Sequence, residues 1–186
     1  MKSLSAALLL LLSAGLFAVE LTSLKNVSDW IIRFPVKRHQ TYKLIQYSRK
    51  EGSAAEITAV PNVFKYTELL LKEPVAIAEK QEEFEGAVSI RLKADNTAGF
   101  VAVSARFEDR AGEVRQFQKI VKLRPGQFET VRIPAGWNVR PERVWGNRDK
   151  NIDYPVRFTG LKFDYNPAVS SLKLTMDDLK WENLKK

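Results

Sequence analysis

Apolar and polar residues alternate with a period of two along much of this chain. Val88, Ile90 and Leu92 are separated by Ser89 and Arg91, so one side of this segment is apolar and the other is polar. In a β-strand every second side chain lies on the same face, whereas a helix requires a period near 3.6. The pattern therefore predicts strands of half-buried antiparallel sheets. It recurs in residues 88–94, 101–108, 161–165 and 172–177.

Turn-forming residues separate these segments. Breaks rich in Gly, Pro, Asn and Asp lie at 95–96, 109–112, 124–126, 134–136 and 166–167. Short strands with such breaks predict an all-β fold, an antiparallel two-sheet β-sandwich. No repeat or linker divides the chain, so we expect one domain over residues 19–186. Further strand candidates are 42–47, 54–59 and 66–71, and residues 79–85 are interpreted as a charged loop or a single helical turn.

Composition excludes several classes of protein. The 186 residues include no cysteine and a single histidine, His39. Disulfide scaffolds, thiolate zinc sites, iron–sulfur clusters and cysteine nucleophiles are therefore excluded, and a histidine-rich metal site is impossible. His39 lies in a basic run without a neighbouring carboxylate, so we interpret it as a surface residue rather than a catalytic one.

The first 18 residues have the layout of a secretory signal peptide. Lys2 is followed by an unbroken apolar run and then by small residues up to Ala18. We expect cleavage after Ala18, export to the periplasm or the extracellular space of a bacterium, and no membrane span afterwards. The alternative is an uncleaved anchor, because the uncharged stretch 3–19 is at the lower length limit for a transmembrane helix.

Three segments follow one another in an order that points to one type of β-sandwich. The first segment, Ala87–Gln118, looks like paired strands joined by an Asp-x-x-Gly turn. The second, Phe128–Trp137, looks like a strand that ends in Ile-Pro. The third, Val144–Trp181, looks like a Trp-Gly loop followed by closing strands that carry Asp-Asp-Leu. Together they resemble the galactose-binding-like jelly rolls of carbohydrate-binding modules. The complex-I-assembly-type modules share this layout. The resemblance implies a jelly roll that binds carbohydrate without catalysis or, as in some members, a protein partner.

Residues 137–165 are rich in aromatic and polar side chains, as expected of a sugar-binding surface. Flat aromatic rings contact the C–H face of a sugar, while charged groups and amides bind its hydroxyls. Gly, Asn and Asp around Trp145 favour a loop that displays this ring. The alternative is that Trp145 fills the core beneath the loop. The predicted binding residues of this region are Trp137, Trp145, Arg148, Asp153 and Tyr154.

The polar faces of two predicted strands offer a second set of candidates. Arg106 shares a face with Glu108, and Asp164 shares one with Lys162. Similar modules bind glycan chains across one sheet, so the resemblance implies that Arg106 and Asp164 lie in the floor of a groove. The alternative is an ordinary solvated face.

Met176-Asp177-Asp178-Leu179 resembles the closing acidic pair of the same modules. The resemblance implies a structural calcium ion held by Asp177 and Asp178, with Glu20 as a further ligand. Calcium takes six to eight oxygen ligands, so these carboxylates alone do not complete a site. The alternative is an exposed strand end, and no other cofactor is expected.

The charge balance suggests the chemistry of a partner. The chain has 30 Lys and Arg against 22 Asp and Glu, a net charge of +8. Arginine forks suit carboxylates and sulfates, and Arg140, Arg143, Arg148 and Arg157 lie near the tryptophans in sequence. These observations favour an acidic polysaccharide. Nucleic acid is not expected, because no nucleic-acid-binding motif is present.

The sequence therefore predicts a secreted, non-catalytic domain that binds a carbohydrate polymer through aromatic platforms and Arg and Asp hydrogen bonds. One alternative is a protein-interaction or structural module of the cell envelope, which would present a broad apolar patch. A second is a small carbohydrate-active hydrolase or lyase, which requires two facing carboxylates. Asp149, Asp153 and Asp164 are available for that role.

Overall fold

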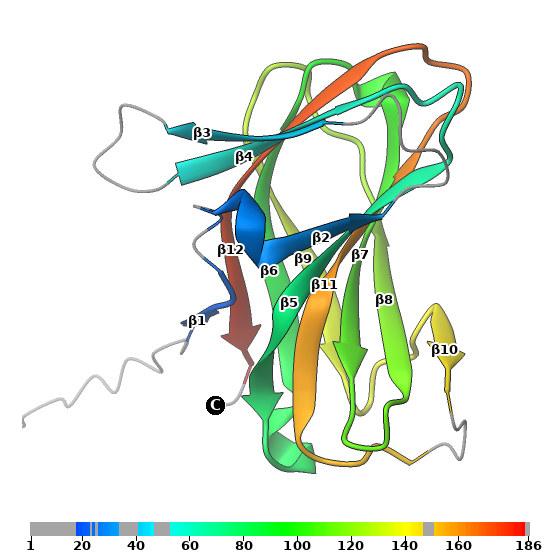
Figure 1. Cartoon of the computed structure of the whole chain (residues 1–186). Helices are drawn as coiled ribbons and strands as arrows, with labels where there is room; N and C mark the ends of the chain where they lie inside the picture. The colour runs from blue at the N-terminus through cyan, green and yellow to red at the C-terminus, as the bar shows by residue number, and fades with distance from the viewer. Residues whose placement is uncertain are drawn as a thin grey trace, which may run out of the picture.

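Two six-stranded antiparallel sheets pack face to face in this protein (Figure 1). The computed structural model describes residues 18–22, 24, 26–33, 41–46, 53–146 and 151–184. The predicted signal peptide up to residue 17 lies outside this range, as do His39, Arg148 and Asp149. Within the described part of the chain, no helix has the length and apolar character needed to cross a bilayer.

The strand order confirms the predicted antiparallel β-sandwich. The first sheet runs β3 (Thr41–Gln46), β4 (Ser53–Ala59), β12 (Leu172–Asn183), β6 (Glu85–Ala94) and β9 (Glu129–Gly136), with β1 (Ala18–Glu20) also paired to β12. The second runs β10 (Arg143–Trp145), β8 (Val114–Ile120), β7 (Phe100–Glu108), β11 (Val156–Tyr165), β5 (Tyr66–Ala78) and β2 (Trp30–Arg33). Single 3-10 turns are η1 (Val27–Asp29), η2 (Gln81–Glu83) and η3 (Thr97–Gly99).

The segments with period-two alternation all lie in strands, and their apolar residues form the core except Val101, which is exposed. Val88 and Ile90 of β6 are fully buried, as are Val103 and Ala105 of β7. The three further strand candidates correspond to β3, β4 and the first half of β5, and η2 is the single helical turn expected near residue 80. Alternation in this sequence therefore reports directly which side chains face the opposite sheet.

A cluster of aromatic rings joins the two sheets. Phe107 of β7 packs edge-on against Phe84, Phe117, Phe158 and Trp181, with ring centroids 5.3–5.7 Å apart. Trp181 belongs to the first sheet and Phe107 to the second. Edge-to-face pairs add to the stabilisation that comes from burying apolar area. This cluster lets the sandwich hold together without a disulfide.

A bulge in β11 determines which residues of that strand point outward. The register shifts between Phe158 and Gly160 against both neighbouring strands, and Phe158 and Leu161 are both fully buried. Gly160 has φ +151°, and a Cβ atom there would lie 2.1 Å from the carbonyl oxygen of Leu69. The extra residue changes the phase of the alternation. Lys162 and Asp164 consequently lie on the outer face of the second sheet.

Candidate functional site

The outer face of the second sheet carries a groove of about 400 Å³. Its strands bring their outward side chains into cross-strand rows, one of which is Arg143–Gln116–Arg106 and the next Ser104–Lys162–Glu68. Side chains opposite each other in an antiparallel sheet are close enough to interact. The groove is lined by Lys65, Tyr66, Glu68, Arg106, Gln116, Arg143, Trp145, Lys162 and Asp164.

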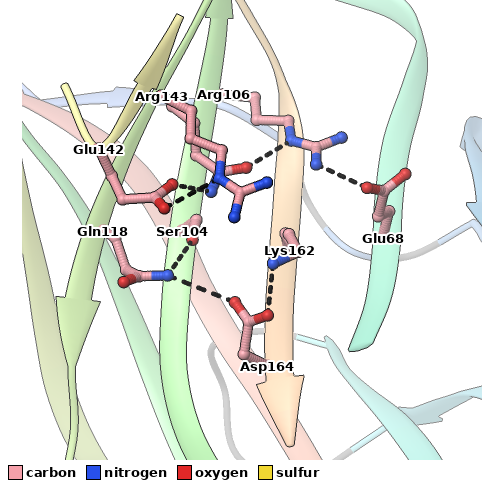
Figure 2. Close-up of polar contacts among 9 residues, drawn as sticks. Glu68, Ser104, Arg106, Gln118, Glu142, Arg143, Lys162 and Asp164 are labelled. Carbon is pink, nitrogen blue, oxygen red and sulfur yellow. Dashed lines mark hydrogen bonds and ion pairs between the residues drawn. The ribbon is translucent and has the colours of Figure 1, made fainter. Parts of the chain in front are cut away.

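Arg106 is held in the middle of the groove from several sides. Its Nη2 donates to Glu68 Oε1 at 2.6 Å and its Nε donates to Gln116 Oε1 at 3.0 Å (Figure 2). Its guanidinium carbon is 5.1 Å from the centre of the Trp145 ring, a cation–π contact. Strand β11 lies between Arg106 and Glu68, but the β11 residue in the row of Arg106 is Gly160. Since Gly160 has no side chain, Arg106 can reach across β11.

A second polar cluster lies beside the first. Lys162 Nζ donates to Asp164 Oδ1, and Gln118 Nε2 donates to Asp164 Oδ2 at 3.4 Å and to Ser104 Oγ at 3.3 Å (Figure 2). The same Lys162 Nζ is 5.0 Å from the centre of the Tyr66 ring. Each of these aromatic rings thus contacts a cation from another strand: Tyr66 contacts Lys162 of the neighbouring β11, and Trp145 contacts Arg106 from two strands away.

Glu142 links the edge strand β10 to the floor of the groove. Its Oε2 accepts a hydrogen bond from Gln116 Nε2 at 2.7 Å, and its Oε1 accepts one from Arg143 Nε at 3.0 Å. Gln116 is 1% exposed, and both ends of its buried amide make hydrogen bonds: Oε1 accepts from Arg106 and Nε2 donates to Glu142. A satisfied buried network has few alternative arrangements, and the polar groups of the floor are therefore fixed in place.

The arrangement suits a ligand built from hydroxylated rings. Trp145 and Tyr66 come from β10 and β5, which are separated by the three strands that form the floor. Both rings are half-buried, and charged and amide groups lie between them. Aromatic faces bind the apolar side of a sugar, and fixed donors and acceptors orient its hydroxyls.

Comparison with solved structures identifies the fold. No protein-family model and no curated protein matches the sequence. A family 11 carbohydrate-binding module from Clostridium thermocellum, in complex with a β-1,3-1,4-mixed-linked tetrasaccharide, matches with TM-score 0.57 and 14% identity over 91% of this chain and 98% of that one. The chain has a carbohydrate-binding-module fold.

Other structural matches agree with this assignment. The family 30 module of the C. thermocellum cellulosomal cellulase Cel9D-Cel44B matches with TM-score 0.51 and 12% identity, over 78% of this chain and 84% of that one. An exo-β-agarase matches with TM-score 0.58 and 11% identity, over 88% of this module and 25% of the enzyme. At these identities the likeness establishes the fold.

The module gathers three of the predicted binding residues in its groove: Arg106, Trp145 and Asp164. Trp145 is neither displayed on a loop, as predicted, nor buried in the core, as the alternative held. It belongs to the edge strand β10, where it is half-buried against Arg106. Three residues of β10 are too few to show alternation in the sequence.

Trp137, Asp153 and Tyr154 do not lie in the groove. Trp137 follows β9 of the other sheet, and its backbone N–H donates to the carbonyl of Phe84 at 2.9 Å. The backbone N–H of Asp153 donates to Asp109 Oδ2 at 3.2 Å, next to the β7–β8 turn. Tyr154 packs against the core, and this burial raises the pKa of its phenol. The predicted role of Arg148 falls outside the described residues.

Sequence reasoning missed four lining residues as sugar-binding candidates: Lys65, Tyr66, Glu68 and Gln116. Arg143 was named only as one of the arginines near the tryptophans that favour an acidic polysaccharide. Lys162 was recognised only as the neighbour of Asp164. Tyr66 and Glu68 alternate with buried residues in β5, so the signal for their shared face was present. The missing information was that β5 lies next to β11.

The predicted calcium site is not formed by the described residues. Asp177 pairs with Arg91 at 3.3 Å and Asp178 with Lys180 at 3.2 Å, so cations occupy both carboxylates. Glu20 lies opposite Lys180 in the β1–β12 register. No group of three acidic or histidine side chains suitable for a metal occurs in the described part of the module. The carboxylates of β12 therefore stabilise the sheet through ion pairs.

A second hollow, of about 360 Å³, lies between the N-terminal segment and β5. It is lined by Leu21, Thr22, Ser28, Asp29, Leu71, Lys72, Glu73 and Val75 and has no aromatic lining. It lacks the flat surface that a sugar ring requires, so the groove is the better candidate.

Proposed function

We propose that this module binds a polysaccharide chain in the groove of the second sheet and does not cleave it. The observation that carries the proposal is the placement of Trp145 and Tyr66 on either side of a fixed polar floor. A protein of the same fold was solved with a mixed-linked tetrasaccharide, which supports a glycan as the ligand class.

The fixed floor has an energetic consequence for binding. Arg106 is held by Glu68 and Gln116 before any ligand arrives. Side chains that are already ordered lose little conformational entropy on binding, and this raises affinity. The groove spans five strands, which fits a chain of several sugar units better than a single sugar.

The groove carboxylates favour binding over hydrolysis. A glycosidase needs one carboxyl group that stays protonated to act as general acid. Glu68 accepts a hydrogen bond from Arg106, and Asp164 accepts one from Lys162. Both carboxylates are thus engaged in ion pairs that order the floor of the groove. We therefore propose a non-catalytic role for both.

We also propose that the protein is exported after cleavage behind Ala18, from the signal-like sequence of residues 1–18. N-terminal sequencing of the protein recovered after expression of the full chain in a bacterium tests this step. Export and cleavage give Val19 as the first residue in the periplasmic or culture fraction. A chain that starts at Met1 and remains with the membranes contradicts it.

A glycan array that contains neutral and acidic polysaccharides tests the central proposal. We expect binding to a defined glycan that Trp145→Ala weakens strongly without loss of fold. If no glycan binds and a protein partner is captured through this face instead, the module is an envelope interaction domain. Release of reducing ends from the bound glycan would show an enzyme.

A further inference from the structure

Each carboxylate in or beside the groove is already bonded to a cationic side chain of the protein, and some guanidinium donors are not. Glu68 is bonded to Arg106, Asp164 to Lys162 and Gln118, and Glu142 to Arg143 and Gln116. The lining residues include four cations against two carboxylates. A ligand that enters the groove therefore meets spare donors and positive charge.

The spare donors are concentrated on Arg143 and Arg106. Arg143 contacts the described residues through Nε alone, so both of its terminal nitrogens are free for a ligand, and its side chain is 68% exposed. Arg106 uses Nε and Nη2, which leaves Nη1. Terminal guanidinium nitrogens bind the oxygens of carboxylates and sulfates with strong, charge-assisted hydrogen bonds.

The strand register places Arg143 and Arg106 on either side of Gln116. Both lie opposite Gln116, Arg143 from β10 and Arg106 from β7, so their Cα atoms are separated by two strand spacings, about 10 Å. Gln116 is buried between them and Trp145 is the next outward residue of β10. Two long cationic side chains and an aromatic ring therefore meet over one buried amide.

We infer that the row Arg143–Gln116–Arg106 is a subsite for a sugar that carries an anionic substituent, a carboxylate or a sulfate ester, while its ring contacts Trp145. This inference rests on the proposed function and names the ligand chemistry at one end of the groove. An anion bound there accepts charge-assisted hydrogen bonds from the terminal guanidinium nitrogens, so it adds affinity over the neutral sugar.

Three forms of one polymer test the inference by affinity electrophoresis: mixed-linked β-glucan, the same glucan with its primary alcohols oxidised to carboxylates, and the same glucan sulfated. We expect an anionic form to bind with an affinity about tenfold higher than that of the parent polymer. This ratio corresponds to the free energy of about one charge-assisted hydrogen bond. Which form gains identifies the anion. The gain should shrink as salt increases.

Arg143→Gln should bring the affinity for the anionic form down to that for the neutral polymer, so that the ratio of the two affinities falls to about one, whatever the change in neutral binding. Arg124→Gln is the matched control, because Arg124 is 71% exposed and also bonds a glutamate through Nε, at 3.1 Å, outside the groove lining. Equal binding of all three polymers, with Arg143→Gln unchanged, overturns the inference and leaves the proposed function intact. A gain that both variants reduce equally also overturns it, because general charge then explains the effect. Failure of all three polymers to bind also overturns the inference, whereas the proposed function is decided separately by the glycan array.

Discussion

At the scale of the residue, glycan binding depends most on Trp145. Its ring is the largest apolar surface in the groove and is stacked with Arg106. We predict that Trp145→Ala raises Kd by about thirtyfold, which corresponds to about 2 kcal/mol for the loss of a central aromatic contact. Isothermal titration calorimetry measures the change. Trp137→Ala is the control, because Trp137 is 46% exposed but lies outside the groove. An equal loss in both variants would contradict the assignment of the groove.

The same scale shows how far the site could be predicted from the sequence. Alternation correctly placed Arg106 and Asp164 on outward faces, because the pattern of burial along one strand is local. It could not predict that Glu68 meets Arg106, because that contact depends on the order β7–β11–β5 and on the missing side chain at Gly160. Trp137 and Tyr154 were selected for composition alone, and composition carries no information about which sheet a residue joins.

At the scale of the element, the bulge in β11 determines the shape of the binding face. We predict that Gly160→Ala destabilises the fold by at least about 3 kcal/mol, since its Cβ would lie 2.1 Å from the Leu69 carbonyl oxygen in addition to the cost of a positive φ. Urea unfolding measures this change. Gly112→Ala is the matched control: Gly112 has φ +81° and open space around it, so only the backbone cost of about 1–2 kcal/mol applies. Equal losses would show that the close approach to β5 is unimportant.

Irregular and short elements account for most of the fold that the sequence did not predict. The turn predicted at 134–136 was also wrong: these residues end β9, an edge strand, where proline is tolerated. Alternation marked strand β12 only over residues 172–177, but the strand continues to Asn183. A register shift between Asp177 and Lys180, with Asp178 at φ 51°, interrupts the alternation there. The edge strands β2 and β10 have four and three residues, too few for a periodic signal. The alternating segments of β6, β7 and β11 were correctly predicted because the inward side chains of each are buried along most of the segment.

At the scale of the whole molecule, the aromatic cluster makes the two sheets a single cooperative unit. Phe107→Ala should lower the free energy of unfolding by about 3–5 kcal/mol, because the cavity lies between both sheets. Circular dichroism and tryptophan fluorescence should report one coincident urea transition for the wild type and for the variant. Val101→Ala on the same strand, where the side chain is 42% exposed, should cost less than about 1 kcal/mol. Separate transitions for the two probes would mean that the sheets unfold independently.

The most direct test of the account is an NMR titration of the ¹⁵N-labelled module with the oligosaccharide that binds best in the glycan array. The account predicts that the largest shift changes occur at the indole N–H of Trp145, the side-chain amide of Gln116, and backbone amides of β5, β7, β8, β10 and β11. Residues on the outer face of the first sheet, such as Lys173 and Arg132, should not respond. Changes centred on that face, or at Trp137, would contradict the claim that this module binds glycans in its groove.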